Sequence, residues 1–340
     1  MPSVVAVIQL QAITMGKFLR NKRGMALILS ILIISLIVSL TLQFNRSMRS
    51  DVHAAANLRD GIKLGCIAKS GFNYALAVLL ADASEGSVDS LQEAWADPKT
   101  LSENSASLFE EGRFQVQISD HSARIQINHL VDNQQPQQFV PAQKDLLKRF
   151  LTQFGLEDEE AENIINAIKD WIDSDNTGTD EFARAENAYY QGLERPYDCK
   201  NAPIEFLEEL LLIRGITKEL FYGTEEMPGI ANFLSPHGEG TININTADPV
   251  VLKALSTEIT YEMVENMLEY RNDEERDLSA VNWSERVGVS DVPVEESLLS
   301  TKSTHFEIAS QGFKGVMAKQ VTGMVKRTEQ EFDILSWKVE

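Results

Sequence analysis

The sequence predicts an α+β protein in which a long N-terminal helix lies on an antiparallel sheet and a large all-helical domain is inserted between the strands. Segments with alternating apolar residues occur before residue 130 and again after residue 304, whereas residues 141–271 contain successive helical patterns separated by polar loops. An uncharged apolar stretch precedes all of these segments. We therefore expect strands from both ends of the chain to share one sheet.

The N-terminal helix contains a predicted membrane span. Residues 24–45 carry no charged side chain, and at about 1.5 Å per residue such a helix crosses the roughly 30 Å hydrocarbon core of a bilayer. Apolar residues then continue at helical spacing, with Leu58, Ile62 and Cys66 four residues apart. We assign residues 25–80 to one helix and residues 25–45 to the span.

Charge is distributed unevenly about this span. All 51 Asp and Glu residues lie at position 51 or later, together with only 25 of the 31 Lys and Arg residues. Positive charge before a span and negative charge after it orient the C-terminal part away from the cytoplasm. A strongly acidic exported part also repels phosphate backbones, so we expect no nucleic acid partner.

The junction between Gly24 and Met25 resembles a processing site. Four basic residues stand just before it: Lys17, Arg20, Lys22 and Arg23. A secretory signal would place a small-residue cleavage site beyond the apolar core, and none follows here. The order of basic residues, glycine and apolar helix resembles the leader of type IV pilins and pseudopilins, which prepilin peptidase cuts after the glycine. An uncleaved signal anchor is the alternative.

The resemblance makes residues 1–24 a leader. Because Met15 would start a compact basic leader, residues 1–14 are either a leader extension or a mispredicted start. Both alternatives stay open.

The strands are predicted from alternation of apolar and polar residues. Residues 114–118 and 125–127 alternate around a turn at 120–122 and predict a two-strand unit. Further strands are predicted from three C-terminal segments: 305–310, 315–328 and 331–339. We thus divide the exported part into a first sheet portion, an inserted helical domain and a final sheet portion: 81–140, 141–285 and 286–340.

An acidic loop after the helix ending at Trp171-Ile172 predicts a calcium site. Asp173, Asp175 and Thr177 alternate before Gly178, which matches the opening of a calcium loop that supplies hard oxygen ligands. The closing bidentate Glu of an EF-hand is missing, because Arg184 occupies that position.

The nearest closing ligand is Glu186, two residues later. We therefore predict a calcium loop of another type, whose ligands are Asp173, Asp175, Thr177 and Glu186. Asp180 or Glu181 is an alternative ligand. A solvated acidic turn without a metal is the alternative. Zinc is disfavoured because the loop has no His and no second Cys beside it.

A second motif, TININTADPVVLKAL, spans residues 241–255. Asp248 and Pro249 suit the start of a helix, so an extended segment leading into a capped helix is the structural interpretation. The alternative is a helix-hairpin-helix of a membrane-anchored DNA receptor of the competence type. The hairpin at residues 256–260 has no glycine for a phosphate to approach and contains Glu258, which disfavours DNA binding.

Neither catalysis nor a disulfide is predicted. The five His residues are scattered, and the chain contains no H-E-x-x-H or G-x-S-x-G motif. We expect no enzyme, although an anchored hydrolase with a noncontiguous site remains a third hypothesis. An oxidising compartment would permit a bond between Cys66 and Cys199, but two distant cysteines fix no framework.

Taken together, the motifs resemble one family. The order of DWIDSDNTGTDEFARAENAYY, ERPYDCKNAPIEFLEELLLIRGIT, TININTADPVVLKAL and STHFEIASQGF is similar to the K-type minor pseudopilins of type II secretion systems over essentially the whole chain. The resemblance implies a pilin-like frame, calcium in the acidic loop, and a single-pass protein of the bacterial inner membrane with a periplasmic C-terminal domain. It also implies I-type and J-type minor pseudopilins as partners, prepilin peptidase as processing enzyme, N-methylation of Met25, and exported proteins as possible contacts.

The fifth residue after the cleavage point is Leu29. Most pilin subunits carry Glu at this position. The resemblance implies that this Glu pairs, in those subunits, with the terminal amine of a neighbouring subunit. A carboxylate inside the membrane is costly unless it is paired, so a subunit with no neighbour ahead of it gains by losing the charge. Leu29 thus predicts a tip subunit that initiates or caps the pseudopilus, although Leu is also the default residue of any span.

Overall fold

A computed structural model describes residues 22–86, 88–132, 135, 137–179, 185–289, 292–328 and 331–340. Most of the predicted leader, including Met15, lies outside the described residues, as do Asp180, Glu181 and Arg184. The chain divides into two compact units, Met1–Lys63 and Leu64–Glu340. Each unit is described by itself below.

In the first unit, helix α2 carries the predicted membrane span. The helix runs from Lys22 to Glu85 and so continues from one unit into the next. Its N-terminal part has a mean hydropathy of 2.8 over an 18-residue window, and none of that window is buried within the protein. The length and composition of the helix therefore suit a membrane span. Met25 and Leu29 are 54% and 60% exposed, which is expected of side chains that face lipid.

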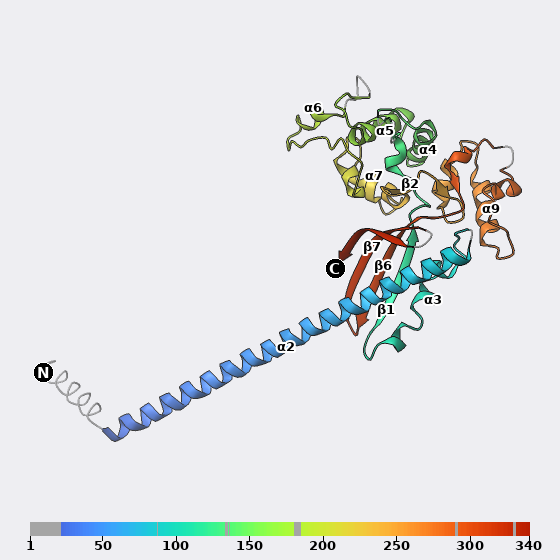
Figure 1. Cartoon of the computed structure of the whole chain (residues 1–340). Helices are drawn as coiled ribbons and strands as arrows, with labels where there is room; N and C mark the ends of the chain where they lie inside the picture. The colour runs from blue at the N-terminus through green and yellow to red at the C-terminus, as the bar shows by residue number, and fades with distance from the viewer. Residues whose placement is uncertain are drawn as a thin grey trace. The chain divides into compact units, whose positions relative to one another are not determined.

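In the second unit, four antiparallel strands form one sheet in the order β1-β6-β7-β8 (Figure 1). Their bounds are Arg113–Asp120 for β1, His305–Lys314 for β6, Met317–Arg327 for β7 and Phe332–Val339 for β8. Strand β1 pairs with β6 in a register that places Ile118 opposite Ile308. Strands from the two ends of the chain therefore share one sheet, as predicted.

The part of α2 after Leu64 covers one face of this sheet (Figure 1). Ala68, Phe72, Ala75 and Leu79 recur every three or four residues and are each 0% exposed, which is the spacing of one helix face. They share a core with the inward-facing strand side chains Phe114, Val116, Phe306 and Ile308. The helix and sheet lie so close that a Cβ atom at Gly312 would be 2.6 Å from the carbonyl oxygen of Leu64.

One short segment covers the outer edge of β1. It comprises η1 (Ala94–Ala96), α3 (Pro98–Ser102) and η2 (Ser105–Leu108). The Ser102 hydroxyl accepts a hydrogen bond from the N–H of Val116, and the Ser105 hydroxyl donates to the carbonyl of Phe114. These side chains satisfy backbone groups that an edge strand would otherwise leave unpaired.

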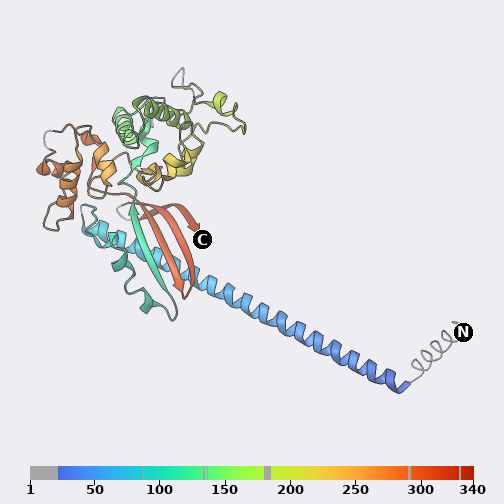
Figure 2. The same cartoon turned by 180° about the vertical axis from the view of Figure 1, so that it is seen from behind.

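The helical elements between β1 and β6 lie beyond the end of the sheet where β1 ends (Figure 2). The α-helices are α4 (Pro141–Thr152), α5 (Asp158–Ile172), α6 (Asn187–Tyr190), α7 (Lys218–Tyr222), α8 (Pro249–Ala254) and α9 (Tyr261–Asn272). The 3-10 helices are η3 (Ile127–Leu130), η4 (Leu207–Leu212), η5 (Ile230–Phe233), η6 (Trp283–Val287) and η7 (Glu296–Leu298). They enclose a second hydrophobic core, which is separate from the core between α2 and the sheet.

Two expectations about this region are wrong. The insertion is not all helical, because β2 (Ile125–Gln126) pairs in parallel with β3 (Leu234–Ser235), and β4 (Ile242–Asn243) pairs in parallel with β5 (Leu299–Ser300). Strand β2 therefore does not form a two-strand unit with β1. Both residues of β2 are buried, so the alternation seen in the sequence did not mark a sheet with one solvated face.

Candidate metal centre

Helix α5 brings the first residue of the acidic loop, Asp173, to the interior of the helical region. The helix begins with a capping box, in which Glu157 and Glu160 satisfy each other's backbone N–H groups. Its apolar face is buried up to Ile172. Asp173 then ends the helix with an extended backbone, while its N–H still bonds to the carbonyl of Lys169 at 2.9 Å. The Asp173 carboxylate is consequently 0% exposed.

Three of the four predicted ligands lie together. One carboxylate oxygen from each of Asp173, Asp175 and Glu186 lies within 4.8 Å of the other two. Glu186 reaches this position because it directly precedes α6 and is only 4% exposed. The structure thus joins the end of α5 to the start of α6 through a group of acidic side chains.

The carboxylates of this group are incompletely hydrogen-bonded. Oδ1 of Asp173 and both side-chain oxygens of Glu186 are buried and have no hydrogen-bond partner among the described residues. A buried acceptor without a donor costs about 1–3 kcal/mol, and more when it is charged. Burial and repulsion by Asp170, Asp173 and Asp175 raise the pKa of Glu186 to about 7.

Among the described residues, Lys169 is the cation paired with this group, and it compensates the group only in part. The Lys169 ammonium lies 2.7 Å from Oδ2 of Asp173 and 3.0 Å from the hydroxyl of Thr179. Even so, burial raises the pKa of Asp173, with the Lys169 interactions opposing this shift. Asp170 is already satisfied, since it accepts hydrogen bonds from Thr179 and from the N–H of Ala185. Neither of its side-chain oxygens is therefore without a donor.

The fourth predicted ligand, Thr177, lies on the exposed side of the loop. Its backbone N–H donates to Oδ1 of Asp175 at 2.6 Å, which shapes the loop. Its hydroxyl as a ligand stays a prediction. Sequence reasoning missed Asn201, whose amide donates to the carbonyl of Asp175 and whose Oδ1 is buried without a partner among the described residues. No spacing rule connects residue 201 to this loop.

The donor set fits a hard divalent cation. Carboxylate oxygens are the preferred ligands of Ca²⁺, whereas Zn²⁺ prefers His nitrogen and Cys thiolate. The neighbouring Cys199 donates from its thiol to the carbonyl of Asp170 at 3.4 Å, and burial raises its pKa to about 12. Cys199 therefore supplies no thiolate. Both cysteines are free, with Cys66 exposed and Cys199 buried.

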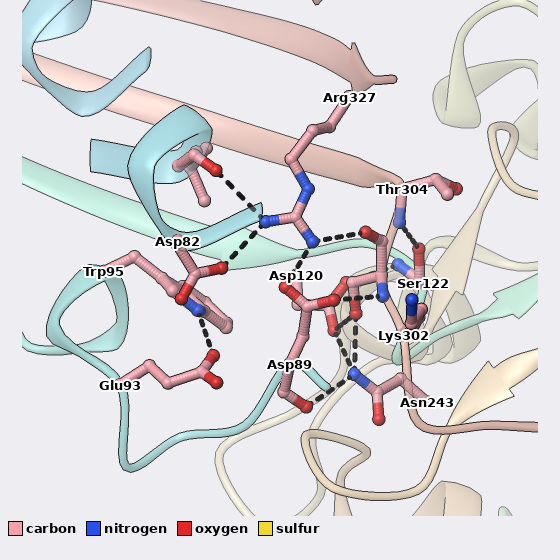
Figure 3. Close-up of polar contacts among 12 residues, drawn as sticks. Asp82, Asp89, Glu93, Trp95, Asp120, Ser122, Asn243, Lys302, Thr304 and Arg327 are labelled. Atoms are coloured by element: carbon pink, nitrogen blue, oxygen red, sulfur yellow. Dashed lines mark hydrogen bonds and ion pairs between the residues drawn. The ribbon is translucent and has the colours of Figure 1, made fainter. Parts of the chain in front are cut away.

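A second acidic group lies where α2 ends (Figure 3). One carboxylate oxygen from each of Asp82, Asp89 and Glu93 also lies within 4.8 Å of the other two. The guanidinium of Arg327 enters this group, with Nη1 2.9 Å from Asp82 and Nη2 hydrogen-bonded to Asp89. Glu93 accepts from the indole N–H of Trp95 at 2.7 Å, and burial raises its pKa to about 7. This group thus contains its own cation.

The TININTADP motif is used structurally. Asn243 donates to Ser303, and Thr246 donates to the buried carboxylate of Asp120 at the end of β1. Asn245 accepts from the indole N–H of Trp283 at 2.7 Å, and Asp248 caps α8. These side chains are occupied inside the protein, which favours the structural interpretation over a DNA-contacting hairpin.

The predicted processing and assembly residues stand on α2. Gly24, Met25 and Leu29 are all helical. Processing between Gly24 and Met25, and the role of Leu29, stay predictions.

An antiparallel sheet packed on the C-terminal part of an apolar N-terminal helix, with a large insertion between its first and second strands, defines a pilin-like protein. Residues 123–225 match the family model described as "Type II secretion system (T2SS), protein K". The chain is 25% identical over 311 residues to "Type II secretion system protein K" of Aeromonas hydrophila, covering 85% of this chain and 88% of that protein. It is 27% identical over 263 residues to the protein of the same description in Pseudomonas aeruginosa, and the match covers 75% of this chain and 74% of that protein.

A solved structure gives the same result for the fold. A chain of "The Crystal Structure of the GspK-GspI-GspJ complex from enterotoxigenic Escherichia coli Type 2 Secretion System" matches with a TM-score of 0.63 and 18% sequence identity. The match covers 84% of this chain and 99% of that chain. The comparisons confirm the resemblance to protein K of type II secretion systems.

Proposed function

We propose that this chain is a minor pseudopilin of a type II secretion system that stands at the tip of the pseudopilus and initiates and caps its assembly. The observation that carries the proposal is similarity to protein K over 85% of the chain, together with a pilin-like fold. The role is structural and needs no catalytic site. By this proposal, the chain supports the export of folded proteins across the outer membrane.

Helix α2 supplies the anchor. By this proposal, prepilin peptidase cuts after Gly24, Met25 becomes an N-methylated terminus, and the span holds the protein in the inner membrane with the second unit in the periplasm. Leu29 then leaves the start of the span without a carboxylate, so no neighbour is required to neutralise it. The proposed tip position follows from the absence of a carboxylate at residue 29 and from the bulk of the insertion, which by this proposal blocks addition of a further subunit.

The proposed partners are I-type and J-type minor pseudopilins. The matched solved structure is of a complex that contains three differently named components, which supports assembly with other subunits. Exported proteins are further possible contacts.

The first test is the mass and N-terminal sequence of the protein extracted from membranes of its host, with and without prepilin peptidase. We expect a peptidase-dependent start at Met25, with one added methyl group. An unprocessed terminus in both strains would contradict the anchoring mechanism. Co-purification of I-type and J-type subunits with the processed protein then tests the assembly role.

We also propose that Ca²⁺ binds Asp173, Asp175, Thr177 and Glu186. The orphaned oxygens of Asp173 and Glu186 support this assignment, because a bound cation satisfies them and offsets the repulsion between them. The ion supplies structural order and no chemical step. Calcium titration of the EGTA-stripped full chain in detergent tests the proposal, and an absence of binding would refute it.

The competing functions have less support. Residues 141–285 contain 31 Asp and Glu against 12 Lys and Arg, a charge balance that opposes binding to phosphate backbones. The DNA-receptor hypothesis predicts salt-sensitive retention of DNA by the full chain. The hydrolase hypothesis predicts a single polar substitution that abolishes secretion while assembly persists.

A further inference from the structure

Four of the five histidines lie far apart in the sequence but come together where the sheet meets the helical insertion. These are His121, His129, His237 and His305, and we call the group the histidine junction. His121 directly follows β1, and its N–H donates to the carbonyl of His305, the first residue of β6, at 2.9 Å. In η3, Nε2 of His129 lies 3.0 Å from the carbonyl oxygen of Gly238. The group therefore stands where the chain passes between the sheet and the insertion.

The ring of His121 bridges these two parts. Its Nδ1 lies 3.0 Å from the hydroxyl of Ser235 in β3, and its Nε2 lies 4.0 Å from the carboxylate of Glu307 in β6. The Ser235 hydroxyl donates to the carbonyl of His237 at 2.8 Å, so it accepts from His121. Nδ1 therefore carries the proton of a neutral ring. Nε2 is left as a buried acceptor without a hydrogen-bond partner among the described residues.

His305 is held in a similar way. Its side chain is 4% exposed, and Nδ1 lies 2.8 Å from the hydroxyl of Thr304. Opposite His305 in β7 stands Lys326, whose ammonium pairs with the carboxylate of Glu239 in the insertion at 2.6 Å. A protonated His305 would place a second positive charge beside this pair.

Burial makes protonation of these rings unfavourable while the junction is closed. Burial lowers the pKa of His121 well below its ordinary value, and repulsion by Arg124 adds to this shift. Burial also lowers the pKa of His305 to about 4 and reduces that of His237. For His305, attraction by a carboxylate and repulsion by an ammonium, those of Glu239 and Lys326, act in opposite directions. Separation of the segments admits water and removes the burial penalty, so the open junction binds protons more tightly.

Two further carboxylates face the junction. Glu307 is 41% exposed, so water screens its attraction to His121. Asp120, at the end of β1, has a pKa raised to about 6, chiefly by burial. Asp120 therefore takes up a proton in the closed state and opposes opening in acid. The three rings with lowered pKa act in the other direction.

We propose that the histidine junction is a pH-dependent joint, which holds the insertion on the sheet at neutral pH and opens in mild acid. The insertion and the sheet have separate hydrophobic cores, so the joint opens while both cores stay folded. The orientation of the insertion relative to the sheet thus depends on pH. This device is independent of the role proposed for the chain and of the acidic loop.

The experiment is hydrogen–deuterium exchange of the full chain in detergent at pH 8 and pH 5, with rates corrected for the intrinsic pH dependence of amide exchange. Backbone bonds across the joint report its opening. The N–H of Thr304 donates to the hydroxyl of Ser122 at 3.0 Å (Figure 3), and the N–H of Asn243 donates to the carbonyl of Ser122 at 2.9 Å. Residues 308–314 of β6, which pair with β1 and β7, are the reference segment.

The test variant combines His121→Asn with His305→Asn. Asn places an amide donor near the position of Nδ1 in each ring and takes up no proton in this pH range. His53→Asn is the matched control, because His53 is an exposed histidine on α2 outside the junction. Glu93 and Asp120 stay in every variant, so their titration is common to all of them.

We expect protection of the junction amides in the wild type and in His53→Asn to fall by about tenfold or more from pH 8 to pH 5. A pKa of 6.5 in the open state and about 4 in the closed state makes His305 alone favour opening about 30-fold at pH 5. The lowered pKa of His121 adds to this effect, and Asp120 offsets about tenfold. In the double variant, protection should stay constant or rise.

Three outcomes would overturn the proposal. The first is equal protection of the wild-type junction amides at the two pH values. The second is an equal fall in the double variant, which would assign the effect to other groups. The third is an equal loss of protection in residues 308–314, which would indicate acid unfolding of the sheet. If circular dichroism at pH 8 shows the double variant unfolded, His305→Asn alone replaces it, and its fall in protection should be about 30-fold smaller than that of the wild type.

Discussion

The described residues contain two groups of three acidic side chains whose carboxylate oxygens lie within 4.8 Å of one another, and the groups differ in what neutralises them. In the group of Asp82, Asp89 and Glu93, the guanidinium of Arg327 pairs with the first two carboxylates. Among the described residues, the cation paired with the group of Asp173, Asp175 and Glu186 is Lys169, whose ammonium contacts one oxygen of Asp173.

The number of carboxylates therefore does not identify a metal site. The informative difference is the number of oxygens without donors, because the large majority of buried acceptors in stable proteins have a partner. In the described residues, the group near Arg327 has no orphaned carboxylate oxygen, whereas the group after α5 has three. The first is neutralised by a side chain of the protein, and the second is the group to which we assign the proposed cation.

The strongest test of this comparison removes the internal cation. Arg327→Ala should destabilise the protein by about 3–5 kcal/mol, because it leaves buried carboxylates uncompensated. Arg327 and Asp89 side chains are only 8% and 2% exposed. Chemical denaturation of the full chain in detergent measures the effect.

The matched control is the adjacent residue on β7. Lys326 pairs with Glu239 at 2.6 Å, but the two side chains are 38% and 50% exposed. Lys326→Ala should cost less than about 1 kcal/mol, since exposed ion pairs contribute little. Equal losses in the two variants would mean that the network around Arg327 is not a buried compensating unit.

The second prediction concerns stabilisation by calcium. At a free calcium concentration of 100 times the dissociation constant, binding should stabilise the wild type by about 2.7 kcal/mol. Glu186→Gln should lose most of this gain, and in EGTA it should be at least as stable as the wild type because the repulsion is relieved. Thermal melts with and without calcium measure both effects.

Asp198→Asn provides the control for that experiment. Asp198 is an exposed acid nearby that accepts a hydrogen bond from Gln191. It should keep the full calcium response. A similar loss in Asp198→Asn and Glu186→Gln would indicate general charge screening rather than a specific site.

The third prediction uses Cys199 as a reporter. Its N–H and thiol bond to groups flanking the acidic loop, so ordering of this loop by calcium should slow its reaction with a thiol reagent. We expect about a tenfold slower reaction in calcium than in EGTA, which corresponds to about 1.4 kcal/mol of added protection. Cys66→Ser removes the exposed thiol from the measurement, and equal rates in calcium and EGTA would contradict the prediction.

A further prediction is a pH dependence near Arg327. The pKa of Glu93 is about 7 in the folded protein, above its ordinary value of 4.5. The folded state therefore takes up a proton first, and the contribution of Glu93 to stability is lost as pH rises through 7. As pH falls from 8 to 5, the free energy of unfolding of the wild type should increase relative to that of Glu93→Gln, as measured by denaturation. A flat difference would show that burial does not shift this carboxyl group.

Much of the fold was predictable because local patterns specify it. The apolar run of α2, the strands β6 to β8 and the helix α5 each have a periodicity that a single segment reveals. The acidic loop was predictable too, since Asp173 and Asp175 are neighbours in sequence and Glu186 follows soon after.

The remaining features depend on contacts between distant residues. The network around Arg327 combines Asp82, Asp89 and a β7 side chain that are far apart in sequence. Asn201 approaches the loop only after the chain has turned through α6. The segment Leu207–Leu212 has a helical pattern but forms a 3-10 helix, in which the Glu209 carboxylate accepts from the N–H of Phe206. Tertiary packing here overrides local propensity.

The continuity of α2 has a practical consequence for producing a soluble form of the protein. The helix contains the predicted span and also supplies Phe72 and Leu79 to the interior of the sheet domain. Truncation at the end of the apolar run, or as late as Lys63, retains these side chains. Truncation at Glu85, where the helix ends, would remove one wall of the hydrophobic core and leave the inner face of the sheet open to solvent. A soluble fragment must therefore begin inside the helix and not after it.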